Sequence, residues 1–243
     1  MLNISNRISI NTIGGGGDGL TKIFTDYGFL NMWSTDNMLV SGTTTTLYDY
    51  AGEHDLVNPA AVNQPTFNAT DSDFNNKPSI EYDGIAEYIQ KAVSNYRTGD
   101  TDGVAIIVLN DVGGASRGAF NWSNAASEAY FAFGTTNNKA QYVKSNAVPL
   151  NSSATSAGSK VIGLSFDGVN GKSFEDGVEV TFGDTTAASG WLDLGTSLLT
   201  SGALIKSATL YYNTKVVFFG YMPFVSDAQT IALQNELKTY YGI

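Results

Sequence analysis

Apolar and polar residues alternate along much of the chain in short runs, and the runs are separated by residues that favour turns. Alternation with a period of two is typical of β-strands with one buried face. The separators include Asp-Gly, Gly-Gly and Asn-rich pairs, which adopt tight turns at little cost. Many short strands joined in this way predict an all-β fold, a jelly-roll sandwich of two antiparallel sheets. The predicted strands are residues 79–82, 104–109, 130–133, 141–143, 161–166, 178–182, 209–212 and 216–221.

The segment 104–109 (VAIIVL) differs from the other runs because it is apolar at every position. A strand that is apolar on both faces needs a covering layer on each side. The sequence therefore places this strand at the centre of the fold, between layers.

One helix is predicted, at the C-terminal end of the chain. Ser226 and Gln229 have the spacing of a capping box, and Gly242 can take the left-handed conformation that ends a helix. Helical spacing predicts a buried stripe of Leu233, Leu237, Tyr240 and Tyr241, flanked by Gln234, Asn235 and Lys238. This helix is expected to pack on the sandwich.

A run of glycines, Gly14–Gly19 (GGGGDG), divides the chain into two predicted parts. Consecutive glycines lose much backbone entropy on ordering, so the run is interpreted as a hinge. Residues 1–19 then form an arm and hinge, and residues 20–243 form the jelly-roll domain. Ile4, Ile8 and Ile10 alternate with polar residues in a strand too short to be stable alone. The arm is expected to dock on a partner protein; self-association into a homo-oligomer and a frayed terminus are the alternatives.

Composition excludes several classes of function. The chain has 13 basic and 23 acidic residues, a net charge of −10, which excludes unaided binding of duplex DNA. It has no cysteine, so disulfides and thiolate metal sites are excluded. No run of 18 apolar residues predicts a membrane helix, and residues 1–12 lack the apolar core of a signal peptide. Synthesis in a cytoplasm and no membrane partner are therefore expected.

Four groups of residues, in order along the chain, resemble the concanavalin A-like lectin/glucanase (laminin G-like) jelly rolls, a family common in bacteriophage virion proteins and bacterial surface proteins. They run from the first tryptophan of the chain to the glycine after the predicted helix. The groups are WSTD (33–36) with LYDYAGEHDL (47–56), PTF (65–67) with NKPSIEYDG (76–84) and YI (88–89), FDG (166–168) with FEDGVEV (174–180), and VSDAQ (225–229) with Leu233, Leu237 and YG (241–242).

The resemblance implies a concanavalin A-like fold and architectural roles for its shared residues. Tyr82 is expected to plug the core, Gly84 and Gly177 to form turns, and Asp83 to cap a turn. Two departures concern function. The family's second tryptophan is Tyr48 here, and the strand before the last helix carries VVFF (216–219) where the family usually has a glutamate.

Related jelly-roll glycoside hydrolases carry carboxylates at the spacing of Glu81, Asp83 and Glu87. Such an enzyme needs two carboxylates on one face, one as nucleophile and one as acid. Glu81 and Asp83 share a strand face, while Gly84 predicts that Glu87 lies beyond a turn. Catalysis by Glu81 and Asp83 is the rival hypothesis, and the turn motif accounts for the same residues without it.

A glycan site needs an aromatic platform beside groups that bind hydroxyls. Trp122, Asn121 and Tyr130 supply that mixture and are the candidate carbohydrate-binding residues, with packing in the core as the alternative. Calcium is considered at Asp100 and Asp102, but no ordered ligand pattern supports it. No cofactor or metal site is predicted.

Together these observations predict a non-enzymatic structural protein of a bacteriophage virion, made in the host cytoplasm. Capsid decoration protein, head fibre and tail-associated protein are the positions left open. Its expected partners are other virion proteins, bound through the N-terminal arm, and host-surface glycans. A glycoside hydrolase and a secreted carbohydrate-binding lectin of the same fold are the alternatives.

Overall fold

The structure is a computed structural model that describes residues 17–92, 102–111, 119–123, 130–136, 139–144, 150–151, 158–167, 171–180, 198–204 and 210–243. Most of these residues lie in antiparallel strands, which form one sheet of 16 strands and one of 2. The strands are β1 (Asn31–Ser41), β2 (Thr44–Asp49), β3 (Leu56–Val57), β4 (Thr66–Asp71), β5 (Lys77–Asp83), β6 (Ile89–Ala92), β7 (Gly103–Asp111), β8 (Phe120–Ser123), β9 (Tyr130–Thr136), β10 (Lys139–Lys144), β11 (Leu150–Asn151), β12 (Gly158–Phe166), β13 (Gly171–Glu175), β14 (Val178–Val180), β15 (Leu198–Ser201), β16 (Ala203–Leu204), β17 (Leu210–Tyr211) and β18 (Asn213–Met222). The helices are α1 (Gly17–Tyr27), η1 (Ala61–Asn63), η2 (Ser72–Phe74) and α2 (Asp227–Tyr241).

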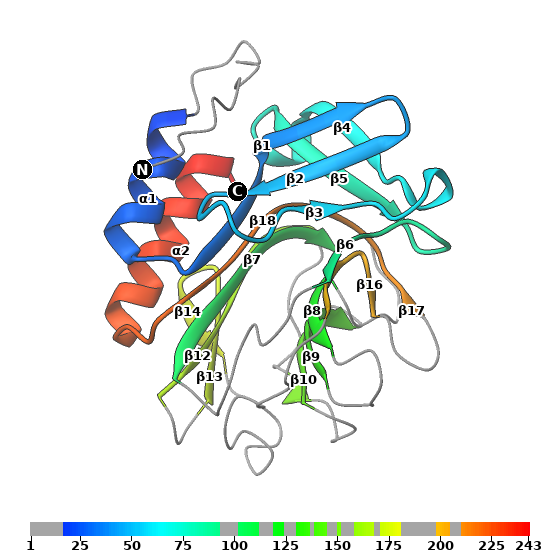
Figure 1. The fold of residues 1–243 in the computed structure, drawn as a ribbon. Coiled ribbons are helices and arrows are strands. Elements are labelled where there is room, and N and C mark those ends of the chain that lie inside the picture. The colour runs from blue at the N-terminus through cyan, green and yellow to red at the C-terminus, as the bar shows by residue number, and fades with distance from the viewer. Residues whose placement is uncertain are drawn as a thin grey trace, which may run out of the picture.

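The large sheet folds back on itself, so that its two halves face each other as a sandwich (Figure 1). One half contains β1, β18, β7, β12, β13 and β14, and the other runs from β6 through β15, β8, β9 and β10 to β11. Phe120 of β8 stacks on Phe219 of β18 with ring centroids 4.2 Å apart, although these strands are distant in the strand order. The all-β sandwich predicted from the sequence is confirmed.

The two faces of the central strands bury different apolar clusters. Ala105, Ile107 and Leu109 of β7 belong to the cluster between the two halves of the sheet. The alternate residues of the same strand, Val104, Ile106 and Val108, belong to a second cluster beneath the helices. The fold therefore has three layers, with β7 in the middle one, as predicted for the strand that is apolar on both faces.

The C-terminal helix α2 begins and ends at the predicted residues. The Ser226 side chain accepts a hydrogen bond from the Gln229 backbone N–H in a complete capping box, and Gly242 ends the helix with φ of 67°. Gln234 differs from the prediction because it is fully buried. Its Nε2 donates to the Phe174 carbonyl (3.0 Å), and its Oε1 accepts from the Gly177 N–H (2.6 Å). Gln234 therefore attaches α2 to the β13–β14 hairpin.

Helix α1 was not predicted, and it begins inside the glycine run that was interpreted as a hinge. Gly17 and Gly19 lie within its first turn. The interpretation of Gly14–Gly19 as a hinge outside regular structure is therefore wrong for residues 17–19. The helix forms because Leu20, Ile23, Phe24 and Tyr27 occupy one face and join the cluster beneath α2. Tyr27 also donates a hydrogen bond to Glu236 of α2 (2.9 Å). Tertiary packing has overridden the low helix propensity of glycine.

The first group of family-like residues forms an architectural hub around Asp49. Its carboxylate is fully buried and accepts hydrogen bonds from the Asn31 side chain and from the backbone N–H groups of Met32, Ala51 and His54. Trp33, also buried, donates its indole N–H to the His54 carbonyl at 2.8 Å. These bonds hold the 50–55 loop against β1, so this motif serves the fold.

Each of the eight predicted strand segments overlaps a strand of the structure. Several strands were not predicted, among them β1, β2 and β15. Tyr82 plugs the core as expected: it is fully buried, and its hydroxyl contacts Ser201 Oγ at 3.0 Å. Gly84 and Gly177 have φ of 73° and 85°, which confirms both as turn glycines.

Candidate functional site

The carboxylate of Asp83, one of the two rival catalytic residues, caps a turn. Its Oδ1 accepts the backbone N–H groups of Ile85 (2.8 Å), Ala86 (3.1 Å) and Glu87 (3.3 Å). Burial alone would raise the pKa of Asp83, but these backbone hydrogen bonds outweigh burial and lower the pKa below its usual value. Asp83 is thus an ionised acceptor that shapes the loop after β5, as the family resemblance implied.

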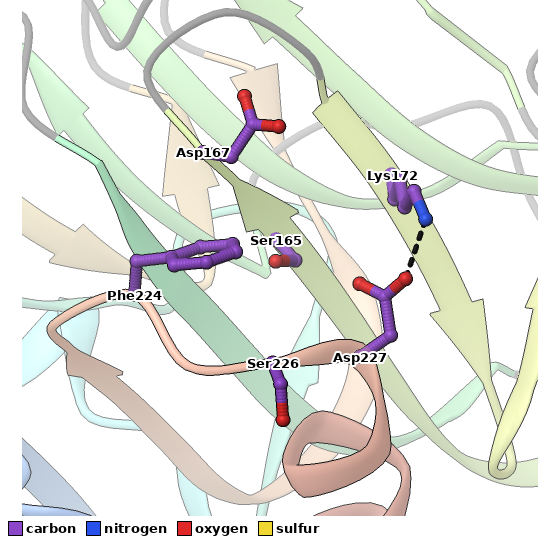
Figure 2. A pocket seen from close by; sticks show the side chains of 6 residues that line it. All are labelled: Ser165, Asp167, Lys172, Phe224, Ser226 and Asp227. Carbon is purple, nitrogen blue, oxygen red and sulfur yellow. Dashed lines mark hydrogen bonds and ion pairs between the residues drawn. The ribbon is translucent and has the colours of Figure 1, made fainter.

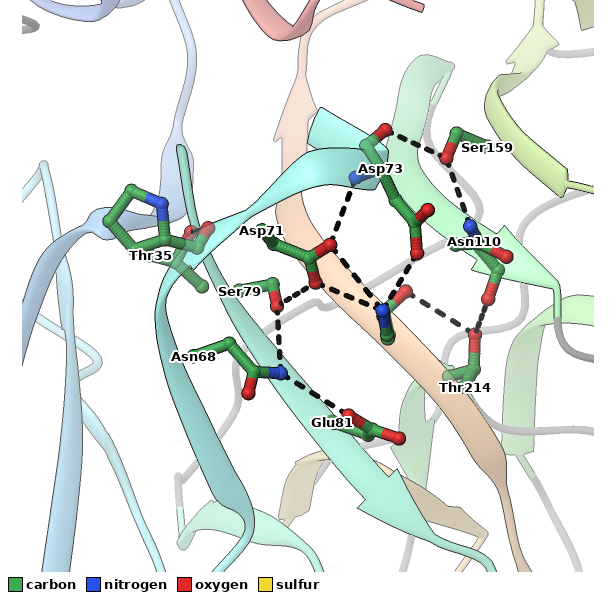
Figure 3. A network of polar contacts seen from close by, with 11 residues as sticks. Thr35, Asn68, Asp71, Asp73, Ser79, Glu81, Asn110, Ser159 and Thr214 are labelled. Carbon is green, nitrogen blue, oxygen red and sulfur yellow. Dashed lines mark hydrogen bonds and ion pairs between the residues drawn. The ribbon is translucent and has the colours of Figure 1, made fainter. Parts of the chain in front are cut away.

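Glu81 and Glu87 also have partners in this region. Glu81 Oε2 accepts from the Asn68 side-chain amide at 3.2 Å, which also lies 3.3 Å from Ser79 Oγ (Figure 3). Glu87 lies beyond the turn, as predicted, and its carboxylate accepts the Asp83 N–H at 2.9 Å. Burial and the nearby Asp83 charge raise the pKa of Glu87. The three carboxylates therefore each hold a neighbouring strand or turn in place.

Beside Glu81 lies a dense polar network, the Asp71 network, which joins η2 to β5 and β18 (Figure 3). Asp71 accepts from Ser79 Oγ (2.6 Å) and from the Asp73 N–H (3.0 Å). The Lys215 ammonium lies 3.2 Å from Asp71 and 2.7 Å from Asp73. Burial would raise the pKa of Asp71, yet the hydrogen bonds from Ser79 and Asp73 and the Lys215 charge lower it overall. The Asp71 side chain is 3% exposed, so this carboxylate is closed to a ligand, while Asp73 at the edge of the network is 38% exposed.

The predicted glycan-binding residues lie on β8 and β9. Asn121 is fully buried, and its amide donates to the backbone carbonyls of Thr200 (3.3 Å) and Ala203. Its side chain therefore supports the neighbouring strand β15 instead of reaching solvent. Trp122 pairs with Leu199 and Phe131 in the sheet, and Tyr130 pairs with Ser123. The side chains of Trp122 and Tyr130 lie outside the described part of the structure, so their binding role stays a prediction.

A surface pocket of about 310 Å³ opens where β12 and β13 meet the start of α2 (Figure 2). We call it the α2 pocket. The Phe224 ring, 37% exposed, forms one side, and Ser165 lies between this ring and the opposite side. The remaining lining residues are polar or charged: Asp167, Lys172, Ser226 and Asp227. The pocket thus combines an aromatic face with groups that bind hydroxyls.

An ion pair forms the polar side of the α2 pocket. Lys172 Nζ lies 2.5 Å from Asp227 Oδ2 and 3.8 Å from a Glu179 carboxylate oxygen. The hydrogen bond with Asp227 raises the pKa of Lys172, so the ammonium stays charged. Ser226 is occupied as the cap of α2, since its Oγ accepts from the Gln229 N–H at 3.3 Å. Asp227 lies in the first helical turn, where the helix dipole favours a negative charge.

Sequence reasoning did not find the α2 pocket. Its residues come from two segments that are distant along the chain, at 165–172 and 224–227, and no local pattern joins them. One signal was available: Phe224 is a large apolar residue two positions before the helix cap Ser226, outside the predicted core stripe. An aromatic residue at such a place has no predicted partner in the core.

Ile4, Ile8 and Ile10, the predicted partner-docking residues, lie outside the described residues, as does Asp100 of the calcium alternative. Within the described ranges, no three His, Cys, Asp or Glu side chains gather as a metal site needs. Neither described α-helix is long and apolar enough to span a membrane.

No protein-family model and no curated protein sequence matches this chain. Solved structures do match in fold. A Trypanosoma rangeli sialidase, solved with 2,3-difluorosialic acid as a covalent intermediate, is similar with a TM-score of 0.56 and 11% identity over 87% of this chain and 33% of the sialidase. The same sialidase in complex with the inhibitor DANA gives a TM-score of 0.54 at 10% identity, over 86% of this chain and 32% of that one.

A smaller protein matches over most of its own length. Domain 4 of AbnA, a GH43 extracellular arabinanase from Geobacillus stearothermophilus, solved in complex with arabinotriose, has a TM-score of 0.52 and 10% identity, with 70% of this chain and 81% of that domain covered. The chain spans about a third of the length of the sialidases but most of the arabinanase domain. At these identities the similarity establishes the sandwich fold and leaves the function to the site.

Proposed function

We propose that this protein is a non-enzymatic structural component of a bacteriophage virion, a capsid decoration, head-fibre or tail-associated protein, that is made in the host cytoplasm and binds host-surface glycans. The family resemblance supports the virion role. The fold supports glycan binding, because domains of the same architecture occur in a sialidase and in an arabinanase domain solved with arabinotriose.

The observation that carries the non-enzymatic part is the use of the β5 carboxylates. A glycoside hydrolase would need Glu81 and Asp83 to face a sugar as nucleophile and acid. Asp83 instead accepts three backbone N–H groups, and Glu81 accepts the Asn68 amide. The pKa of Asp83 lies below its usual value, which suits a permanent hydrogen-bond acceptor and not a general acid.

The hydrolase alternative is tested directly with Glu81→Gln. We expect the wild-type protein to release no reducing sugar from β-glucans or from capsular polysaccharides of candidate hosts, and Glu81→Gln to behave in the same way. Glu53→Gln, at an exposed loop position, is the matched control. Turnover by the wild type that disappears only in Glu81→Gln would replace the structural proposal with the hydrolase.

The virion role is tested by mass spectrometry of purified particles, in which the chain should be present at a fixed copy number. Residues 1–16 precede α1, so a variant that lacks them retains every described element. We expect this variant to fold but to be absent from particles, because Ile4, Ile8 and Ile10 are proposed to dock on a virion protein. Normal incorporation would assign the anchor to the sandwich, and loss of a homo-oligomer alone would identify the arm as a self-association element.

The secreted-lectin alternative predicts a glycan site without a particle. Glycan-array binding that is lost in Trp122→Ala at unchanged stability, with no trace of the chain in virions, would favour it.

A further inference from the structure

We infer that the α2 pocket is the glycan site of this protein, and that it takes the end of a neutral saccharide and not an acidic sugar. This inference rests on the proposed glycan binding and names the site and the ligand class. The pocket volume of about 310 Å³ lies at the small end of the range for ligand pockets, which suits the terminal part of an oligosaccharide.

The aromatic side of the pocket is the first support. Phe224 lies in the linker between β18 and α2, lines the pocket and has more than a third of its surface exposed. The exposure of an aromatic ring to water is unfavourable, and an apolar surface that stacks on the ring removes this contact with water. The C–H face of a sugar ring is such a surface, and its edge carries hydroxyls that need polar partners.

Ser165 supplies the second, independent support. It points away from the sandwich core, because its neighbours Leu164 and Phe166 in β12 belong to the cluster between the sheet halves. The residue is 2% exposed and lines the pocket. Its hydroxyl lies at the wall of the pocket, where it can donate to or accept from a ligand hydroxyl.

The charge of the pocket decides the ligand class. Asp167 and Asp227 line it, and Glu179 lies 3.8 Å from the one lining cation, Lys172, which Asp227 already holds. Carboxylates accept hydrogen bonds from sugar hydroxyls but repel a sugar carboxylate. Arginine, the residue best suited to bind a carboxylate in two-point fashion, is not among the described residues that line the pocket. The pocket therefore favours neutral sugars.

A second aromatic surface provides the matched control. Tyr88 and Tyr211 form a pair with ring centroids 6.1 Å apart, beside the turn that Asp83 caps. This pair lies on other elements than the α2 pocket, and replacing Tyr211 leaves the pocket residues unchanged. Val178, an exposed apolar residue of β14, is a second control for loss of apolar surface.

The test measures binding of three neutral probes, arabinotriose, maltotriose and cellotriose, and of one acidic probe, 3′-sialyllactose, by saturation-transfer NMR and calorimetry. We expect the full-length protein to bind at least one neutral probe and to bind sialyllactose more weakly. Phe224→Ala should weaken binding about tenfold, which is the loss of about 1.4 kcal/mol. Phe224→Tyr should keep most of the affinity, and Ser165→Ala should weaken it by a smaller factor.

Melting curves of every variant separate loss of the site from loss of the fold. Tyr211→Ala and Val178→Ala should bind like the wild type. Equal binding by Phe224→Ala and wild type overturns the inference, and if Tyr211→Ala then abolishes binding, the glycan proposal stands with a different site. A preference for sialyllactose overturns the ligand class. Absence of all binding overturns the inference and the glycan part of the proposed function together, while mass spectrometry of virions decides the structural part separately.

Discussion

Two lysine–aspartate pairs in this protein use the same chemistry in opposite surroundings. Lys215 and Asp71 lie within the Asp71 network, where the two side chains are 20% and 3% exposed. Lys172 and Asp227 lie at the edge of the α2 pocket, where they are 41% and 40% exposed. The first pair has further partners on η2 and β5, namely Asp73 and Ser79. The second has one further and exposed neighbour, Glu179, 3.8 Å from Lys172, and the Phe224 ring lines the same pocket.

The difference separates a part that holds the fold from a part available to a ligand. A buried carboxylate must be fully hydrogen-bonded, and the Asp71 network meets that need within the protein. An exposed pair contributes little to stability because water screens it. The atoms of this pair that face solvent can therefore bind the hydroxyls of a ligand without loosening the sheet. This contrast leads to predictions about stability, of which the first concern the Asp71 network.

Removing the carboxylate of the closed network should have the largest effect. Asp71→Ala leaves Ser79 Oγ and the Asp73 N–H without their acceptor and takes one of two anions from Lys215. We expect the free energy of unfolding to fall by about 3 kcal/mol, measured by urea denaturation. Asp73→Ala, at a more exposed position, is the control and should cost less. If the two variants lose the same stability, the network is not the closed unit described above.

The same carboxylate should make stability depend on pH. The pKa of Asp71 in the folded protein lies below its usual value of 3.8, so the carboxylate stabilises the fold above that pH. This contribution is lost as the pH falls from 3.8 through the lower folded-state pKa. Asp71→Asn should be less stable than wild type at pH 7, and the difference should shrink below pH 3.8. Denaturation curves at several pH values measure it, and a constant difference would contradict the assignment.

Asp36 is a carboxylate whose partners do not compensate for its burial, and it should show the opposite sign. Burial raises its pKa, although the Lys77 charge and the Ser34 hydroxyl oppose the rise. An acid with a raised folded-state pKa favours folding below its usual pKa of 3.8 and loses that contribution as the pH rises through the folded value. Asp36→Asn should therefore raise the melting temperature at pH 7, with the gain fading in acid. Glu53→Gln, on an exposed loop, should change nothing.

The fold was largely predictable because its strongest signals are local. The all-apolar segment of β7 needs a covering layer on each face, and the capping box of α2 marks the start of a helix. Both features were predicted correctly. Helix α1 was missed because the glycine run suggested a break, although Leu20, Ile23, Phe24 and Tyr27 have the spacing of a helical face. The apolar face outweighed the glycines once α2 was present to cover it.

The candidate site was far less predictable. The carboxylates of β5 have a spacing that also occurs in enzymes, and only the structure shows that Asp83 is used by a turn. Asn121 has an amide side chain of the kind that binds sugar hydroxyls, but this side chain is buried against β15. The α2 pocket joins Ser165, Lys172 and Phe224 from separate strands and a linker, so no window of sequence contains it. Sites of this kind follow from tertiary contacts, which periodicity does not report.

The smallest effect on stability is expected at the exposed pair of Lys172 and Asp227. Lys172→Met removes the ammonium but leaves Asp227 in the first turn of α2, where the helix dipole still favours its charge. The melting temperature should stay within experimental error of the wild type. Lys215→Met, the matched change in the closed network, should lower it clearly, because Asp71 would remain buried without its cation. If Lys172→Met destabilises the protein as much as Lys215→Met does, the rim of the α2 pocket is part of the structural framework and is not free to serve a ligand.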